Sequence, residues 1–483
     1  MIRIPLPALR ASLAAAALAL AACSSDPEIV CAAGEQVCGG ACTSVELDSS
    51  NCGACGAACG AYQECNAGAC ECGPGTVECG GGCVDLSSDP ASCGACGVAC
   101  GTGQVCAGGA CASACPAGQL SCGGACADLA SDRWNCGACG VRCDRGESCR
   151  EGACRPDVYV ACFATDDVRP ANAALRAGLP RAAGDGPIAL GVSAGRLWAA
   201  ASLSHSLVAF PLDLGAAGVE TMLGGGDLEA LSVSGDRLWV ANAAAGSLVV
   251  YDAAARRVVD EVVLGTTGVN PRWVAFANGR AYAALYGLDA TSGGQEVAVI
   301  DPATGEILRR IDLRALADAP GLPFPAHAVV AGGRVFVTLA NLRLGEWGYY
   351  TDPAGSGKLA VIDPAADDAL SSIDLGDGCL NPGGLAASAD GRMLWVACGG
   401  SAAVLPVELG EAGVVTLHAP VAAPDFSAPG NIALCGRDAY VTDQWSGSVW
   451  RFDPSTGERL AAGEICPASQ AGWAWAADVA CAP

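Results

Sequence analysis

The sequence predicts an all-β protein in which three small disulfide-rich repeats precede a closed ring of seven antiparallel sheets. Three observations support this fold class. Cysteines crowd the first third of the chain at spacings that occur three times over. An aromatic residue within a short β-type run recurs seven times in the remainder. The intervals between those aromatics, 39 to 59 residues, suit one sheet of about four strands per interval.

Length and charge exclude several classes of protein. A chain of 483 residues exceeds one compact domain. Its 26 Lys+Arg stand against 50 Asp+Glu, so the surface repels nucleic acid, and we expect no such partner. The sequence contains no run of about 18 apolar residues, which excludes a polytopic membrane protein.

Residues 1–22 have the pattern of a secretory signal peptide, with Arg3 and Arg10 before an apolar stretch too short to span a bilayer. The stretch ends Leu20-Ala-Ala-Cys23, which resembles the bacterial lipobox. The resemblance implies a lipid on Cys23, residues 23–30 as anchor and short linker, and a membrane partner through that anchor. Ser24, rather than aspartate, favours the outer membrane. The alternative is an ordinary signal peptide with Cys23 unmodified.

Three repeats follow, at residues 31–70, 71–111 and 112–154, and each has eight cysteines with the same seven spacings. These repeats have few large apolar side chains, so we expect disulfides to hold them together. Eight cysteines allow 105 connectivities, and the sequence does not choose among them. Each repeat also contains a Cys-Gly-Ala-Cys run, at Cys52, Cys93 and Cys136, which leaves zinc or redox chemistry as the alternative.

The run Asn51-Cys-Gly-Ala-Cys-Gly56 and its two later copies resemble the stigma-specific cysteine-rich family. The resemblance implies an extracellular disulfide module without enzyme activity, and it names no ligand.

Residues 155–483 carry the aromatic signature, a polar turn followed by an aromatic in a short strand. The seven aromatics are Tyr159, Trp198, Trp239, Tyr282, Phe336, Trp395 and Tyr440. Strand alternation directs each one to a sheet face that the next sheet can cover. Most copies are followed by a hairpin such as Asp301-Pro-Ala-Thr-Gly305, which is typical turn chemistry.

These elements resemble the YVTN-type β-propeller repeat, which Tyr440-Val-Thr-Asp443 matches closely. The resemblance implies a seven-bladed β-propeller over residues 155–483. The chain enters this region in the second strand of a blade, and we expect residues 471–479 to supply the missing first strand and close the ring.

The six cysteines after residue 154 test this strand register. Their positions at strand ends predict the pairs Cys379–Cys398, Cys162–Cys466 and Cys435–Cys481. Free buried thiols are the alternative.

Two candidate binding regions follow from the expected blades. Positions expected at the mouth of the central channel are Asp227, Glu229, Arg272, His327, Asn381 and Asn431. An extended loop, residues 341–358, carries Arg343, Trp347, Tyr349 and Tyr350, which suit a protein or glycan contact unless the loop folds over its own blade.

We therefore predict a lipid-anchored envelope protein whose disulfide-stapled stalk carries a propeller that binds a protein or glycan. We expect no catalytic residue, resident metal ion or cofactor. The alternative is a hydrolase or lyase of the lactonase kind at the channel mouth.

Overall fold

The computed structural model describes residues 35–266, 268–289, 291, 293–346, 349–410, 414–422, 425, 427–469 and 472–483. The expected signal peptide, Cys23 and Trp347 lie outside this range. The described chain is almost entirely β, with three short 3-10 helices, η1 (Phe163–Thr165), η2 (Arg314–Leu316) and η3 (Pro364–Ala366). Within it, no helix has the length and hydrophobicity needed to cross a bilayer.

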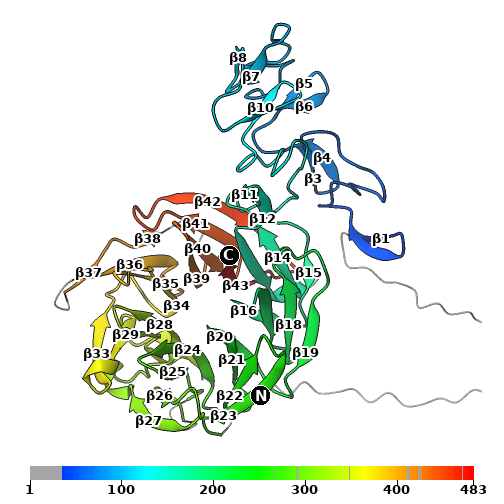
Figure 1. Cartoon of the computed structure of the whole chain (residues 1–483). Coiled ribbons are helices and arrows are strands. Elements are labelled where there is room, and N and C mark those ends of the chain that lie inside the picture. The colour runs from blue at the N-terminus through cyan, green and yellow to red at the C-terminus, as the bar shows by residue number, and fades with distance from the viewer. Residues whose placement is uncertain are drawn as a thin grey trace, which may run out of the picture.

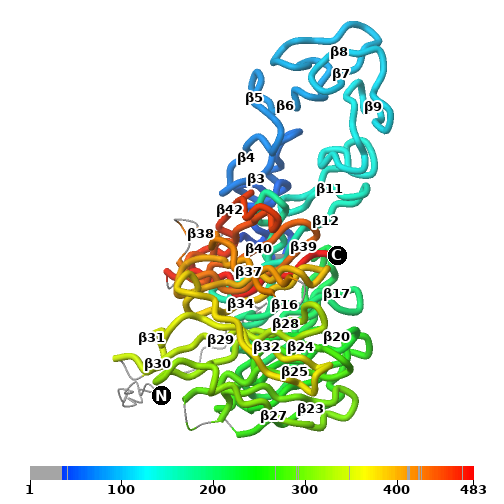
Figure 2. The backbone as a smooth tube through the Cα atoms, turned by 90° about the vertical axis from the view of Figure 1, so that its left-hand side faces the viewer, coloured from blue at the N-terminus to red at the C-terminus, as the bar shows by residue number. Residues whose placement is uncertain are grey.

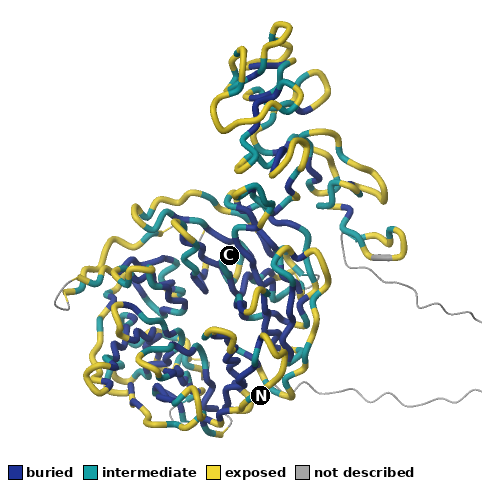
Figure 3. The backbone as a smooth tube through the Cα atoms, viewed as in Figure 1, coloured by how far each residue is buried: buried dark blue, intermediate teal, exposed yellow. Residues whose placement is uncertain are grey.

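The cysteine-rich region consists of short two-residue-turn hairpins and loops. Its described strands are β1 (Glu35–Cys38), β2 (Ala41–Ser44), β3 (Gln63–Asn66), β4 (Ala69–Cys72), β5 (Val77–Cys79), β6 (Gly82–Val84), β7 (Val105–Ala107), β8 (Ala110–Ala112), β9 (Leu120–Cys122), β10 (Ala125–Ala127), β11 (Ser148–Arg150) and β12 (Ala153–Arg155). Little of this region is buried, as the yellow and teal trace in Figure 3 shows.

Disulfides hold the repeats together, and their connectivity recurs. The second repeat contains Cys72–Cys83, Cys79–Cys96, Cys93–Cys106 and Cys100–Cys111. The third contains the equivalent four pairs, Cys115–Cys126, Cys122–Cys139, Cys136–Cys149 and Cys143–Cys154. The described part of the first repeat has Cys38–Cys55, Cys52–Cys65 and Cys59–Cys70 at equivalent positions. The expected disulfide framework is therefore present, with a connectivity that spacing alone left open.

The recurring Cys-Gly-Ala-Cys run has a packing role. Its glycine has a positive φ and lies against the backbone of a second glycine fifteen residues later, where a Cβ would come within 2.5 to 2.7 Å of the carbonyl oxygen. The three pairs are Gly53 with Gly68, Gly94 with Gly109 and Gly137 with Gly152. Only glycine fits both requirements, which explains why the run is the same in each repeat.

The propeller region contains, among the described residues, seven sheets of four or five antiparallel strands. From the centre outward the first sheet is β43 (Ala476–Cys481), β13 (Val158–Cys162), β14 (Asp167–Ala171), β15 (Arg181–Ala182); the second is β16 (Pro187–Ser193), β17 (Arg196–Ala201), β18 (Ser206–Pro211), β19 (Val219–Met222); the third is β20 (Leu228–Ser234), β21 (Arg237–Asn242), β22 (Ser247–Asp252), β23 (Arg257–Val263); the fourth is β24 (Pro271–Ala277), β25 (Arg280–Leu285), β26 (Glu296–Ile300), β27 (Ile307–Asp312).

The remaining three sheets follow the same plan. The fifth is β28 (Pro325–Ala331), β29 (Arg334–Leu339), β32 (Lys358–Asp363), β33 (Ala369–Asp374), with the hairpin β30 (Leu342–Leu344) and β31 (Tyr350–Pro353) inserted; the sixth is β34 (Pro382–Ala387), β35 (Met393–Cys398), β36 (Ala403–Leu409), β37 (Val415–Leu417), with β38 (Val421–Ala422) also on β36; the seventh is β39 (Pro429–Cys435), β40 (Asp438–Asp443), β41 (Ser448–Phe452), β42 (Arg459–Glu464).

The innermost strands pack against one another in order and return to the start, so the sheets form a ring around a central channel (Figure 1). The C-terminal strand β43 is the first strand of the sheet that begins with β13, as expected, although it covers residues 476–481 rather than 471–479. Cys162–Cys466 and Cys435–Cys481 join the two ends of the ring, and Cys379–Cys398 links the loop before β34 to the end of β35 in the sixth sheet. All three predicted pairs are present.

The signature aromatics form the core between sheets. Each lies in the second strand of its sheet and is almost fully buried. The ring of Trp198 meets Tyr251 of the next sheet at 5.4 Å between centroids, and Trp239 meets Phe276 at 5.6 Å. Covering each sheet face by its neighbour removes these large apolar surfaces from water, which is the main energy that holds the ring closed.

The outer hairpins follow the predicted turn chemistry. The Asp301 carboxylate accepts a hydrogen bond from the amide of Ala303, and its carbonyl accepts one from Gly305, which has a φ of 71°. Asp453 and Gly457 repeat this arrangement in the seventh sheet.

The cysteine-rich array folds back on itself rather than forming a linear stalk. Figures 1 and 2 show the second repeat (β7, β8) farthest from the propeller, while the first repeat (β3, β4) returns beside the third (β11, β12). The Trp134 ring packs edge-on against Tyr62 and directly on Gly73, where no Cβ would fit. The disulfide-stapled stalk expected from the sequence is therefore folded back on itself, because contacts between distant repeats bury surface that one repeat alone cannot.

A buried carboxylate in the first repeat contacts both the third repeat and the propeller. Glu64 in the first repeat is only 2% exposed. Its two oxygens lie 2.5 Å from Arg133 of the third repeat and 2.7 Å from Arg176 of the propeller. Arg145 adds hydrogen bonds to the carbonyls of Cys65 and Ala177. Three segments that are far apart in the chain thus meet at one charge cluster.

Candidate functional site

A cavity of about 430 Å³ lies in the central channel at the end where the first strands begin. Five of the six residues predicted at the channel mouth line it: Glu229, Arg272, His327, Asn381 and Asn431. Trp273, Tyr286, Gln444 and Trp475 also line it, and sequence reasoning missed all four. The volume is in the range of small-molecule sites.

Irregularities in the first strands explain why these residues face the cavity. In the fourth to seventh sheets the pairing skips two residues after the opening proline, for example between Pro271 and Val274 and between Pro325 and Ala328. The skipped residues, such as Arg272, Trp273 and His327, leave the ladder and line the channel. The opening Pro and the break in apolar alternation are the sequence signal for this arrangement.

Hydroxyl groups from the second strands satisfy the backbone at these bulges. Thr338 Oγ1 accepts a hydrogen bond of 3.0 Å from the amide of His327, and Thr442 Oγ1 accepts one of 2.9 Å from Asn431. Both threonines are fully buried. The bulges are therefore fixed in shape, so the cavity wall is preformed.

Asp227, the sixth predicted residue, does not line the cavity. It lies just before β20, and its carboxylate accepts a hydrogen bond from the hydroxyl of Ser202 in the neighbouring sheet. Asp227 lies outside the bulge, because the residue that leaves the ladder is Glu229, between Leu228 and Ala230. Its charge still acts on Glu229 and contributes to raising the pKa of that carboxyl.

One wall of the cavity carries a paired acid and base. Arg272 donates a hydrogen bond to the carboxylate of Glu229, and its guanidinium lies 5.0 Å from the centroid of the Tyr286 ring. Burial raises the pKa of Glu229, an effect that Arg272 opposes and Asp227 reinforces. Burial also raises the pKa of Tyr286. The pair leaves this wall polar with no net charge.

His327 lies flat against Trp273, with 4.5 Å between ring centroids and 26° between the planes. Burial lowers the pKa of His327 to about 3, so the imidazole is neutral at physiological pH. Its Nδ1 is buried and has no hydrogen-bond partner within the described protein. The histidine is thus a weak base that offers a hydrogen-bonding atom.

Amide side chains lie on the other wall. Asn431 Nδ2 donates to the carbonyl of Ala477 at 3.0 Å, which holds the side chain in place. Asn381 has a φ of 47°, in the left-handed region that asparagine tolerates better than most residues. Gln444 packs against Gly430 and also lines the cavity.

The extended loop expected to bind a partner is partly folded onto its own sheet. The ring of Tyr350 packs 5.1 Å from Phe324, and Arg343 lies 3.9 Å from Asp352. Tyr349 is 62% exposed. Tyr350 covers apolar side chains of its own sheet, whereas Tyr349 faces solvent, so only part of the loop folds over its own blade. Trp347 lies outside the described residues.

Two further aromatics are exposed near the channel mouth and were not predicted. Trp445 follows β40 and is 72% exposed, and Trp473 precedes β43 and is 44% exposed. Trp473 adjoins Phe163 and Trp475, at 6.1 and 6.5 Å between centroids. Exposed aromatics beside a cavity are typical of binding surfaces.

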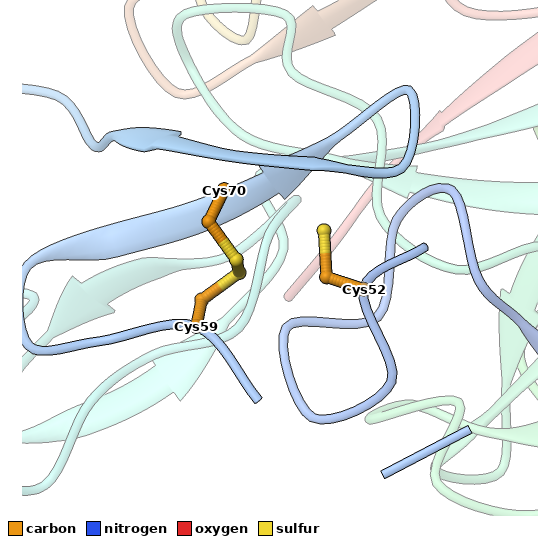
Figure 4. Close-up of side chains that lie close together, drawn as sticks. All are labelled: Cys52, Cys59 and Cys70. Carbon is orange, nitrogen blue, oxygen red and sulfur yellow. A yellow bond between two sulfur atoms is a disulfide. The ribbon is translucent and has the colours of Figure 1, made fainter. Parts of the chain in front are cut away.

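Sulfur atoms also gather in the cysteine-rich array. The sulfur atoms of Cys52, Cys59 and Cys70 lie within 4.8 Å of one another. Figure 4 shows the Cys59–Cys70 disulfide with Cys52 beside it, and Cys52 is bonded to Cys65. The equivalent clusters in the other two repeats are also paired disulfides. Sulfur in a disulfide is not the thiolate that zinc requires, so these clusters are structural.

A larger open groove, of about 840 Å³, runs between the fifth and sixth sheets and ends at Arg334, Asp390 and Arg392. None of the predicted site residues lines it.

Comparison with known proteins gives separate matches for the two parts of the chain. Residues 107–157 match the sequence model of the stigma-specific STIG1-like protein family. No curated protein sequence matches the chain. Solved structures of similar fold include virginiamycin B lyase from Staphylococcus aureus, with 16% identity, 55% of this chain and 80% of that one covered, and a TM-score of 0.43.

Two other solved structures of similar fold have different descriptions. Hydrazine synthase from Kuenenia stuttgartiensis has 16% identity, with 59% of this chain and 91% of that one covered and a TM-score of 0.43. A protein from Lactobacillus plantarum has 15% identity, with 64% and 96% covered and a TM-score of 0.49. At such identities the likeness concerns the fold alone. The chain thus joins a propeller-like ring to a cysteine-rich region of which residues 107–157 are similar to the stigma-specific family.

Proposed function

We propose that this chain is an exported, lipid-anchored protein of the cell envelope whose propeller binds an extracellular partner without chemical turnover. The binding face is the end of the ring that carries the channel cavity, Tyr349, Trp445 and Trp473. The observation that carries the proposal is the cavity itself, a preformed polar and aromatic recess beside exposed aromatic side chains.

The protonation chemistry of the cavity supports binding over acid–base catalysis. A general base works best with a pKa near the operating pH, and burial lowers the pKa of His327 to about 3. The carboxylate of Glu229 is engaged by Arg272. These groups are suited to accept and donate hydrogen bonds to a bound molecule.

In the proposed arrangement the lipidated Cys23 precedes a repeat that adjoins the propeller. Glu35 and Cys42 to Ser44 share a recess with Leu179 to Arg181 at the outer edge of the propeller.

The test uses the full-length protein and envelope material from cells that lack it. We expect the protein to partition into detergent and the mature chain to carry an acyl mass increment that Cys23→Ser abolishes. We also expect it to bind the envelope material, and Trp445→Ala to weaken that binding. Water solubility without acylation would refute the anchor, binding insensitive to the channel-mouth face would refute the site, and a chemically altered ligand would favour the lactonase or lyase alternative.

A further inference from the structure

We infer that the channel cavity and the tryptophans beside it bind a neutral saccharide. The inference rests on the proposed binding function and names the class of ligand. Its basis is the balance of charge in the cavity, a set of buried donors without partners, and aromatic faces inside and outside the recess.

The charges that line the cavity balance each other. The cavity lining contains one acid and one base, Glu229 and Arg272, which neutralise each other, and its histidine is uncharged at physiological pH. The chain as a whole carries a formal charge of −24. An anionic ligand would meet the repulsion of that field, and a cationic one would find its carboxylate already engaged. A neutral polar molecule carries neither penalty.

Three side chains of the cavity lining have buried polar atoms without a hydrogen-bond partner in the described structure. These atoms are Arg272 Nε, Trp475 Nε1 and His327 Nδ1. Arg272 Nε and Trp475 Nε1 are donors, and neutral His327 accepts or donates according to its tautomer. Leaving a buried donor or acceptor without a hydrogen bond costs about 1 to 3 kcal/mol. Each of these atoms is closed off from solvent in this structure, so a ligand meets it only after the side chain turns toward the cavity. Sugar hydroxyls donate and accept at closely spaced positions, which suits a mixed set of this kind.

Aromatic rings form part of the cavity wall. The C–H faces of a pyranose are apolar and pack on flat rings, while its hydroxyls point outward around the edge. The cavity is lined by Trp273, Tyr286 and Trp475, each of which has one face already covered, by His327, Arg272 and Phe163 in turn. The amides of Asn381 and Gln444 lie in the same lining. Rings and amides side by side suit a ligand that is apolar on its faces and polar at its rim.

The exposed Trp445 continues the aromatic lining of the cavity onto the outer surface. Gln444 lines the cavity, and the next residue, Trp445, is exposed. The turn that holds them is fixed by Asp443, whose carboxylate accepts hydrogen bonds from the amides of Trp445 and Ser427 and from the Ser427 hydroxyl. Burial would raise the pKa of Asp443, but these hydrogen bonds outweigh it and lower the pKa. Trp445 is therefore held on a rigid turn.

The segment carrying Trp473 lies beside that turn. The amides of Ile465 and Cys466 both donate to the carbonyl of Gly447, and Gly447 touches Ala474. A saccharide chain leaving the cavity past Gln444 would thus reach Trp445 and Trp473, so the surface is suited to an oligomer longer than the cavity alone holds.

The test is isothermal titration calorimetry of the full-length protein with neutral hexasaccharides of glucose, mannose, galactose and N-acetylglucosamine. Galacturonate and glucosamine hexamers serve as anionic and cationic counterparts. We expect at least one neutral hexamer to bind, its charged counterparts to bind at least tenfold more weakly, and Trp445→Ala to weaken binding at least fivefold without changing the melting temperature. Val414→Ala, in the exposed turn before β37 at the other end of the ring, is the control and should leave binding unchanged.

Treated envelope material separates this inference from the proposed function. Periodate cleaves the vicinal diols of sugars, and protease removes protein. Loss of envelope binding after periodate supports the inference. Loss after protease alone, or tighter binding of a charged hexamer, overturns the saccharide while leaving the binding face in place. Envelope binding that is absent, or unaffected by Trp445→Ala, overturns both.

Discussion

The carboxylate of Asp478 accepts a hydrogen bond of 2.8 Å from the amide of Leu190, 288 residues earlier in the chain. Asp478 lies in β43, the C-terminal strand that completes the first sheet, and Leu190 lies in the inner strand of the second. The side chain also meets Asn431 of the seventh sheet. One buried acid thus bridges the three sheets around the closure of the ring.

The stability of the closed ring should depend on pH through Asp478. Burial raises the pKa of Asp478 from 3.8 to about 7, so its stabilising contribution is complete below about pH 4 and is lost as the pH rises toward 7. The loss amounts to at most about 4 kcal/mol, at about 1.4 kcal/mol per pH unit. We expect the wild type to melt at a lower temperature at pH 8 than at pH 5, and Asp478→Asn to reduce that difference. Calorimetry of both proteins at the two pH values measures it, and an unchanged difference would contradict this role.

The disulfide that joins the ends of the ring should stabilise more than the one within the sixth sheet. Cys162–Cys466 encloses 304 residues and Cys379–Cys398 encloses 19, so the loop-closure entropy differs by about 2 kcal/mol. Replacing both cysteines of each pair by serine in separate proteins, followed by non-reducing denaturant titration, compares the two. Equal losses of unfolding free energy would show that local packing rather than chain closure sets the value.

Glu64→Gln should release the cysteine-rich array from the propeller. It removes the negative partner of Arg133 and Arg176 and leaves two partly buried cations facing each other, which typically costs about 3 kcal/mol or more. We expect faster hydrogen exchange in residues 172–178 and a larger radius of gyration in solution scattering. Glu78→Gln, an exposed position on β5, is the matched control and should change neither. A variant as compact as the wild type would show that Arg145 and Trp134 suffice.

Arg272→Gln should destabilise the protein in a pH-dependent way. Burial already raises the pKa of Glu229, and removing Arg272 removes the interaction that opposes the shift. Because the folded-state pKa then lies further above the unfolded one, stability is retained near pH 4 and lost as the pH rises. We expect the melting temperature to fall more at pH 8 than at pH 4.5. The double variant Arg272→Gln/Glu229→Gln has neither charge of the pair. The pH dependence of its melting temperature should therefore return to that of Glu229→Gln.

The cysteine spacing and the seven aromatic signatures are local patterns, and they were sufficient to predict the fold class. An aromatic such as Trp198 or Trp395 identifies the second strand of its sheet in the sequence, because a turn precedes it and its side chain is buried against a neighbouring sheet. Strand register then placed Cys162 near Cys466 and Cys379 near Cys398, because cysteines at equivalent strand ends meet on one rim. Five channel residues followed from the same register.

The connectivity inside each repeat, the folded-back array and most of the cavity depended on contacts between distant segments. Glu64 meets Arg176 only because the first repeat packs on the third, and Gln444 and Trp475 meet Glu229 only because the ring closes. Asp227 was misplaced because the start of a bulge depends on the pairing of the whole strand. Periodic sequence therefore determined the sheets and the sulfur framework, whose interactions recur at fixed intervals. Tertiary structure decided where the single, non-repeating polar residues meet, because their partners are set by closure and packing and not by position along the chain.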